Sequence, residues 1–174
     1  MAWRQGSGAE QQLTTIVPVE SAEQLAHVRI LLREYADSVG IDLSFQNFDK
    51  ELAELPGQYA LPDGRLLLGL HGTHVAGCIA LRRLTDEICE GKRLYVRPEF
   101  RGRGIGKTLK LAILEEARQI GYKCFRWDSV PSMKEANALY RSLGAKNIAP
   151  YYYNPIEGAL FWELDLTQSL LSPG

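Results

Sequence analysis

The chain has 174 residues, about the length of one domain, and a domain of that size buries a sizeable core. Hydrophobic residues make up 45% and charged residues 24% of the chain, which excludes a disordered chain, a collagen-like repeat and a coiled coil. The formal net charge of -1 lacks the basic excess of a nucleic-acid-binding protein, and no apolar run approaches the length of a membrane span. We therefore expect neither a nucleic acid nor a membrane as a partner.

Both ends of the chain are predicted to lie outside the folded domain. Residues 1–12 are polar and lack the apolar region of a signal peptide, so we expect a flexible N-terminal arm. The domain is predicted to span residues 13–166, followed by a C-terminal tail over 167–174. The three cysteines are an odd number without metal-site spacing, which indicates a reducing, cytoplasmic compartment.

The first half of the chain is predicted to hold four strands and two helices. The β-branched segment from Leu13 to Val19 is typical of a strand. Ser21 and Gln24 form a capping box before a helix that ends at Gly40. A second helix is predicted over 44–55, and three further strands over 65–71, 73–84 and 88–96. Short turns join these three strands, which favours antiparallel pairing.

The second half alternates helices and strands. Apolar residues at helical spacing predict a helix over 105–120 that ends at Gly121, and a strand over 124–130 follows it. Ser132 and Glu135 form a second capping box, for a helix that ends at Gly144. Tyrosines at 151–153 begin a loop, and a last strand covers 158–166. One α/β domain with a mixed sheet accounts for all of these elements.

Charge is distributed unevenly along the chain. From Glu34 to Asp63 there are seven acidic residues and one basic residue, and from Lys92 to Lys110 there are seven basic residues and one acidic residue. The basic segment is predicted to face an anion. The acidic segment either faces a cation or is an ordinary solvent-facing surface, which is the more common case.

The most specific motif is the glycine-rich turn from Arg101 to Thr108, with the sequence Arg-Gly-Arg-Gly-Ile-Gly-Lys-Thr. It lies between a predicted strand and a predicted helix, where glycines let the backbone approach a ligand and free amides attract anions. The turn therefore predicts a phosphate site. A nucleotide-binding Walker A loop would need a glycine at position 101, and the dinucleotide fingerprint G-x-G-x-x-G does not match the G-x-G-x-G spacing found here.

The turn and its surroundings resemble the GNAT superfamily of acetyl-CoA-dependent N-acetyltransferases. The family signature Gln/Arg-x-x-Gly-x-Gly/Ala is matched by Arg101, Gly104 and Gly106. The segments Arg-Leu-Tyr-Val-Arg-Pro before the turn and Asn-Ala-Leu-Tyr-Arg-Ser-Leu-Gly after it also resemble the family, and the order of elements matches over nearly the whole chain. Ala145 departs from the pattern, because relatives usually have Phe after this Leu-Gly pair.

The resemblance implies a single-domain fold and a cofactor site. The expected sheet has six to seven strands, is largely antiparallel and is flanked by helices, with a splayed pair of parallel strands (88–96 and 124–130) forming the acetyl-CoA cleft. Backbone amides of the turn would hold the pyrophosphate, and the backbone of residues 94–96 would pair with the pantetheine arm and polarise the thioester carbonyl. The expected cofactor-binding residues are Leu94, Tyr95, Val96, Arg101, Gly102, Arg103, Gly104, Ile105, Gly106, Lys107, Asn137 and Tyr140.

Two catalytic residues are predicted. Glu90 lies fourteen residues before Gly104, where the histone-acetylating branch of the superfamily has its catalytic base. Glu90 would take the proton of the amine either directly or through a water relay. The alternative is an ordinary ion pair with Lys92 or Arg93. Tyr140 shares a helix face with Asn137, and in many relatives this tyrosine points at the thioester sulfur as the acid. The alternative is that Tyr140 is a core residue.

Other polar residues carry weaker signals. His71 and His74 have His-x-x-His spacing but lack further ligands, so no metal site is expected. Cys89 and Cys124 are candidate sites for an acetyl-enzyme, although strand cysteines are usually buried and inert. The acceptor end of the cleft has candidates in Arg82, Arg83, Arg126 and Asp128, and in the tyrosines at 151–153, which could equally be a loop packed by its own aromatic rings.

The sequence therefore predicts an N-acetyltransferase that transfers the acetyl group of acetyl-CoA to a primary amine by direct attack in a ternary complex. One rival is a non-catalytic acyl-CoA-binding sensor of the same fold, and another is a nucleotide-binding protein that uses Gly-Lys-Thr. The acceptor is a small-molecule or peptide amine, and a homodimer is compatible with the sequence. The acidic segment suits a cationic amine, whereas the arginines suit an amine that carries a carboxylate, and the sequence does not rank these two.

Overall fold

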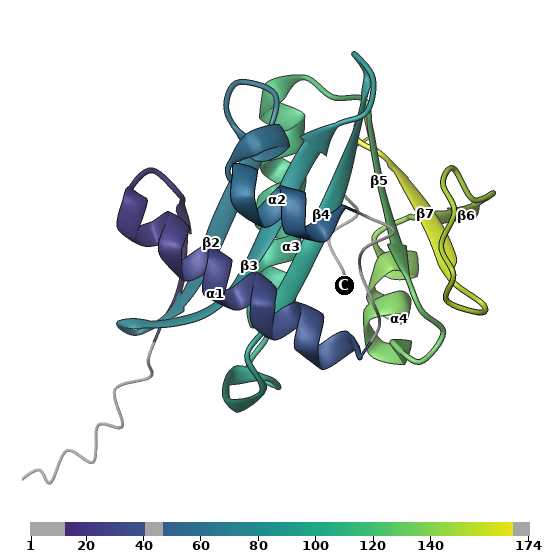
Figure 1. Ribbon diagram of the computed structural model, residues 1–174. Coiled ribbons are helices and arrows are strands. Elements are labelled where there is room, and N and C mark those ends of the chain that lie inside the picture. Colours follow the sequence, from purple (N-terminus) through teal and green to yellow (C-terminus); the bar gives the residue numbers. More distant parts are fainter. Residues whose placement is uncertain (1–12, 41–46, 169–174) are drawn as a thin grey trace, which may run out of the picture.

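The computed structural model describes residues 13–40 and 47–168, which form a seven-stranded sheet with helices on both faces (Figure 1). The strand order is β1-β2-β3-β4-β5-β7-β6. The bounds of the strands are β1 Thr14–Pro18, β2 Arg65–His71, β3 His74–Arg83, β4 Ile88–Val96, β5 Cys124–Ser129, β6 Lys146–Ile148 and β7 Leu160–Asp165. The predicted arm at 1–12 and most of the predicted tail lie outside the described residues.

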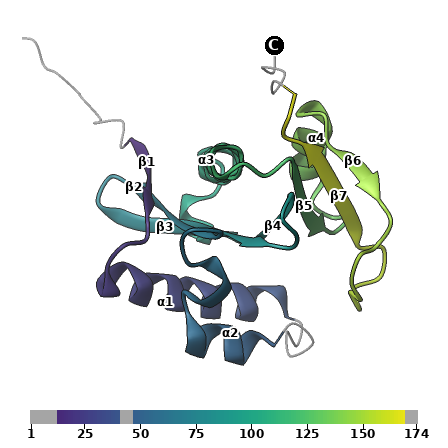
Figure 2. The same cartoon turned by 90° about the horizontal axis from the view of Figure 1, so that it is seen from above.

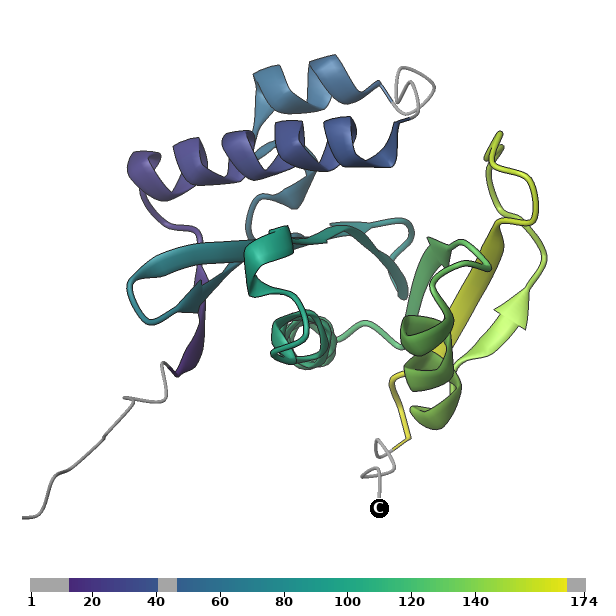
Figure 3. The same ribbon diagram turned by 90° about the horizontal axis from the view of Figure 1, so that it is seen from below.

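Two helices cover each face of the sheet (Figures 2 and 3). On one face lie α1 (Ala22–Val39) and α2 (Phe48–Glu54), and on the other lie α3 (Ile105–Ile120) and α4 (Lys134–Ser142). Each face has its own buried core: Leu31 and Phe48 belong to the core under α1 and α2, and Leu109 and Tyr140 to the core under α3 and α4. No helix within the described ranges is long and apolar enough to cross a membrane.

Every neighbouring pair of strands is antiparallel except β4 and β5, which are parallel. The predicted fold class, a largely antiparallel sheet with one parallel pair, is confirmed. The Ser21–Gln24 capping box is present at the start of α1, and Gly40 ends that helix in the left-handed conformation, as predicted.

Three local predictions need correction. Ser132 does not cap α4, because the Met133 amide donates to the Val130 carbonyl at 3.1 Å and places Ser132 inside a turn before the helix begins. The second helix begins at Phe48 rather than at residue 44, after Asn47 in a left-handed conformation, and residues 41–46 lie outside the described part. The short strand β6 is not predicted, because three residues are too few to show a period.

Two arginines of the basic segment pair with carboxylates of the acidic segment. The Arg97 guanidinium contacts the Glu34 carboxylate of α1 at 2.9 Å, and the Arg93 guanidinium contacts the Glu51 carboxylate of α2 at 2.8 Å. For the other basic residues of the segment, the prediction that they face an anionic ligand stays a prediction. These ion pairs attach the α1–α2 layer to β4 and to the residue that directly follows it.

Candidate active site

The sheet opens between β4 and β5. Their pairing covers three residue pairs and ends at Glu90 and Arg126, after which the strands diverge (Figure 1). A cavity of about 200 Å³ lies beyond this point and is lined by both strands, by Tyr35 of α1, by Lys110 of α3 and by Tyr140 of α4. The predicted splayed pair is thus present, with the predicted cleft between its strands.

Two features of β4 shape this opening. At Gly91, an added Cβ would lie 2.4 Å from the Phe125 ring, so glycine admits the ring where the strands part. Further along, Arg93 and Leu94 together face the single residue Ile79 of β3, and Arg93 has a φ of 61°. Such a bulge removes one residue from the regular ladder and frees backbone groups for another partner.

The glycine-rich turn leaves the start of α3 uncapped. Gly102 and Gly104 both have φ of 77°, a left-handed conformation that favours glycine. Gly104 precedes the first residue of α3, and no side chain caps the helix. The first amides of a helix have no partner within it, and at this end they favour an anion. An added Cβ at either glycine would meet nothing within 4 Å, so the space beside the turn is open.

The basic side chains of the turn are held close to it. Arg101 donates from Nε to the Val96 carbonyl at 3.0 Å, and Arg103 Nη1 lies 3.2 Å from His71 Nε2. Together with Lys107, these are the cations of the basic segment that remain beside the uncapped helix.

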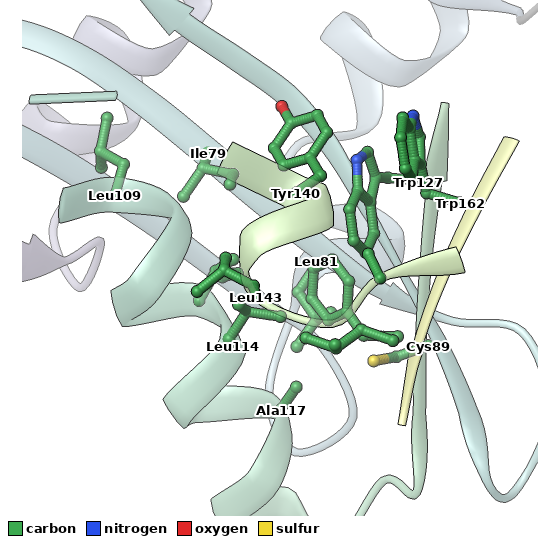
Figure 4. Packing of buried hydrophobic residues seen from close by; sticks show 14 of the residues in the cluster. Ile79, Leu81, Cys89, Leu109, Leu114, Ala117, Trp127, Tyr140, Leu143 and Trp162 are labelled. Carbon is green, nitrogen blue, oxygen red and sulfur yellow. The ribbon is translucent and has the colours of Figure 1, made fainter. Parts of the chain in front are cut away.

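Tyr140 lies where the resemblance places a catalytic tyrosine and is also a core residue. Its ring is 3% exposed and packs edge-on against Trp127 at 4.9 Å and Trp162 at 5.6 Å between ring centroids. Figure 4 shows its hydroxyl pointing away from the apolar side chains of Leu114 and Leu143. The side chain lines the cavity, and burial raises the pKa of the hydroxyl to about 12, so it carries its proton at neutral pH.

Asn137 has both polar side-chain atoms occupied inside the protein. Its Oδ1 accepts from the Ser129 hydroxyl at 2.7 Å, and its Nδ2 donates to the Val130 carbonyl at 3.0 Å. The Trp162 indole in turn donates to the Ser129 hydroxyl at 2.8 Å. This network attaches α4 to the end of β5, and contact between Asn137 and a cofactor stays a prediction.

Glu90 is fully buried beside the cleft. One carboxylate oxygen accepts from Arg82 Nε at 2.8 Å and lies 3.7 Å from Lys92 Nζ, and the other accepts from the Tyr151 hydroxyl at 2.6 Å. Lys92 lines the cavity, whereas Arg93, the other predicted partner, contacts Glu51. Burial lowers the pKa of Lys92, although the neighbouring Glu90 acts in the opposite direction. Glu90 therefore does not line the cavity itself, but its neighbour Lys92 does.

Arg126 and Asp128 lie on the same face of the sheet as Glu90, a point that strand parity alone left open. Phe125 and Trp127, the alternate residues of β5, belong to the core under α3 and α4, so Arg126 and Asp128 face the α1–α2 side. Asp128 lines the cavity, and its Oδ2 accepts from Asn154 Nδ2 at 3.1 Å.

The predicted acceptor-site arginines all have carboxylate partners. Arg82 contacts Glu90, Arg126 contacts Glu163 at 2.7 Å, and Arg83 contacts Asp86 and lies 3.7 Å from Asp63. The tyrosine loop packs largely on itself and on β7, because Tyr151 and Tyr152 contact each other and Phe161.

The sequence pattern does not predict that Lys110 is buried beside the cavity. Lys110 is 3% exposed, and its Nζ lies 3.7 Å from the Trp127 ring centroid and 5.0 Å from that of Tyr140. Burial lowers the pKa of this amine well below its ordinary value. Lys110 directly follows Leu109, an apolar residue of the stripe that predicts this helix, and a lysine in such a position is normally exposed. The buried face of α3 is wider than that stripe because rings from β5 and α4 also cover Lys110.

Comparison with known proteins agrees with this geometry. The sequence model of the acetyltransferase (GNAT) family matches residues 29–145. An uncharacterised N-acetyltransferase of Schizosaccharomyces pombe is 36% identical over 157 residues, which cover 88% of this chain and 96% of that protein.

Solved structures show the same fold. A GNAT family acetyltransferase of Elizabethkingia anophelis with acetyl-CoA bound has a TM-score of 0.61 at 21% identity, covering 87% of this chain and 97% of that one. The PaiA N-acetyltransferase of Thermoplasma acidophilum in complex with coenzyme A has a TM-score of 0.66 at 20% identity, covering 88% and 99%. The chain therefore belongs to the GNAT family of acetyltransferases.

Proposed function

We propose that the protein transfers the acetyl group of acetyl-CoA to a primary amine in the cleft between β4 and β5. The observation that carries the proposal is the uncapped start of α3 beside Val96, at the end of β4 that no longer pairs with β5. The pyrophosphate would be held by the backbone amides of residues 102–107 with Arg101, Arg103 and Lys107 beside them. The pantetheine arm would lie along the backbone of residues 94–96, where the bulge frees groups that can polarise the thioester carbonyl.

The reaction we propose is direct. The neutral acceptor amine attacks the thioester carbonyl, a C–N bond forms, and the C–S bond breaks to release the thiolate of CoA. Tyr140 borders the cavity and its hydroxyl holds its proton at neutral pH, so we assign to it the proton that the thiolate takes up. The attacking nitrogen carries one surplus proton once the C–N bond has formed, and it returns this proton to the Tyr140 phenolate, so that the amide and the CoA thiol are both neutral. An acetyl-enzyme on Cys89 has less support, since burial raises the pKa of that thiol and leaves little thiolate.

Glu90 enters this proposal as the final acceptor of the amine's proton. Its carboxylate is fully buried, so it does not meet the acceptor directly. Lys92 borders the cavity and lies 3.7 Å from Glu90, so its ammonium group can give a proton to the carboxylate and take one from the acceptor in return. This relay replaces direct abstraction in the proposed mechanism.

A variant at Gly106 tests the cofactor site without straining the backbone. An added Cβ there would meet only Val96 Cγ2, at 3.7 Å, so Gly106→Leu points a side chain into the space proposed for the phosphates. CoA at about 100 times its Kd should stabilise the wild type by roughly 2.7 kcal/mol, and the variant should lose this shift. Gln119→Leu, an exposed change at the far end of α3, is the control and should keep it.

The apo Gly106→Leu protein should be at least as stable as the wild type, because glycine is a poor residue in a helix. Thermal unfolding with and without CoA measures both effects. A full CoA shift in the variant would place the cofactor elsewhere. Release of free thiol from acetyl-CoA in the presence of amines separates an enzyme from a non-catalytic acyl-CoA sensor.

A further inference from the structure

Asp128 is a carboxylate at the cleft without a cationic partner of its own. It borders the cavity together with Tyr140, and its hydrogen bond comes from Asn154, a neutral amide. Within the described ranges, no Lys, Arg or His nitrogen lies within 4 Å of it. A partly buried carboxylate in this position has hydrogen-bonding capacity left for a ligand.

The neighbouring acids on the same face differ from Asp128 in this respect. Glu90 contacts Arg82, Glu51 contacts Arg93, and Glu163 contacts Arg126, each with an N–O distance of 2.7 or 2.8 Å. These three carboxylates do not line the cavity, and each has an arginine partner. Asp128 lines the cavity and has no such partner.

The basic side chains at the cavity form no ion pair with Asp128. Arg93 and Lys92 are paired with Glu51 and Glu90. Lys110 lies among aromatic rings, and although the charge of Asp128 favours its protonated form, burial is the larger effect and lowers the pKa of Lys110. Asp128 thus gives the cavity a local negative charge between aromatic walls, which include Tyr35 and Trp127.

From this placement we propose that Asp128 binds the ammonium group of the acceptor, so that the substrate class is amines that enter the cleft as cations. The inference rests on the proposed function, because it takes this cavity as the acceptor site. The Asp128 carboxylate accepts hydrogen bonds from the ammonium and holds the nitrogen in the cavity that Leu94 and Tyr140 border. The ammonium then loses its proton through Lys92 to Glu90 before it attacks.

The inference is tested by binding, without relying on turnover. The probe is 2-phenylethylamine, a primary alkylamine with an apolar ring suited to aromatic walls, titrated calorimetrically into CoA-saturated protein. Asp128→Asn keeps the shape of the side chain and removes its charge, and should weaken binding roughly 10- to 100-fold, as expected for a hydrogen-bonded charge. The matched control is Glu163→Gln, which removes a carboxylate from the same face outside the cavity and should bind the amine like the wild type.

A neutral comparator separates charge recognition from general damage to the cavity. 2-Phenylethanol has the same skeleton with a hydroxyl in place of the ammonium, and its weak binding should be equal in the wild type and Asp128→Asn. Equal amine affinity in these two proteins would overturn the inference. So would an equal loss for the alcohol, or a wild type that binds no amine. Failure of the proposed function would appear separately, as absence of CoA binding to the wild type.

Steady-state kinetics give a second reading. Asp128→Asn should raise KM for the amine and keep most of kcat, because binding is lost while the relay is intact. Glu90→Gln should do the opposite. A variant at Asp128 that loses kcat with an unchanged KM would contradict its assignment as the ammonium-binding residue.

Discussion

At the scale of single residues, Tyr140 combines packing and chemistry in one side chain. Tyr140→Phe keeps the ring contacts with Trp127 and Trp162 and removes only the hydroxyl. We expect kcat to fall roughly 10²-fold or more when chemistry limits the rate, with little change in CoA affinity. Because burial holds the pKa of the hydroxyl at about 12, the loss should be the same at every pH from about 6 to 9. Wild-type turnover in the variant would leave Tyr140 with a packing function alone.

A substitution at Glu90 distinguishes a function in a proton relay from a function in a structural ion pair. In the relay, Glu90→Gln should lower the rate by about 10² to 10⁴ at neutral pH and keep CoA binding. Raising the pH should restore part of the rate, because solvent then deprotonates an alkylamine whose pKa is near about 10.4. If Glu90 serves only to pair Arg82, the variant should instead lose stability and keep its rate. The pH–rate profile and the midpoint of urea unfolding, measured on the same preparation, distinguish the two.

The residues whose sequence interpretation was incomplete are those whose partners come from distant segments. Glu90 was predicted from its spacing to Gly104, but Tyr151, the donor to its second oxygen, lies 61 positions away. The burial of Lys110 likewise depends on rings from β5 and α4. Such contacts follow from tertiary packing, and no local period or motif encodes them.

At the scale of elements, the end of β5 and the start of α4 are connected through the buried side chains of Ser129 and Asn137. Asn137→Ala removes one acceptor and one donor and leaves the Val130 carbonyl without this bond. We expect a loss of roughly 1–3 kcal/mol in the free energy of unfolding, the usual effect of unsatisfied buried groups. CoA titration of the same variant decides the cofactor prediction for Asn137. A large loss of CoA affinity without a loss of stability would favour a cofactor contact over a structural connection.

The elements themselves were largely predictable because their signals are local. Ser21 and Gln24 specify the start of α1, and Gly121 the end of α3, through backbone geometry that only nearby residues determine. The glycine-rich turn was predictable for the same reason. The prediction that Ser132 begins α4 was wrong because a Ser-x-x-Glu pattern also fits a turn that precedes a helix. Hydrogen bonds from Met133 and Asn137 to the Val130 carbonyl stabilise that turn.

At the scale of the whole molecule, charge connects layers that the sequence keeps far apart. Glu34 and Arg97 are 63 residues apart, and Glu51 and Arg93 are 42 apart, yet the two pairs join the α1–α2 layer to β4 and to the residue that directly follows it. Arg93 also takes the left-handed backbone of the bulge, so the same residue anchors α2 and opens the ladder beside the cofactor cleft. Fold and site are therefore coupled through one strand, and changes that loosen the helical layer should also disturb the cleft.

Lys110 makes the stability of the whole protein depend on pH. Its pKa is lowered in the folded state by burial and returns to about 10.4 on unfolding. Between these two values the unfolded chain binds one more proton than the folded protein, so the free energy of unfolding rises with pH by about 1.4 kcal/mol per unit.

Lys110→Met removes this contribution and fits an apolar side chain among the same rings. We expect the variant to be more stable than the wild type at neutral pH, with the difference shrinking as the pH rises toward about 9. Urea unfolding of both proteins across that range gives the difference directly, because all other titrating groups are shared and cancel. Parallel stability curves would mean that Lys110 keeps its ordinary pKa in the fold.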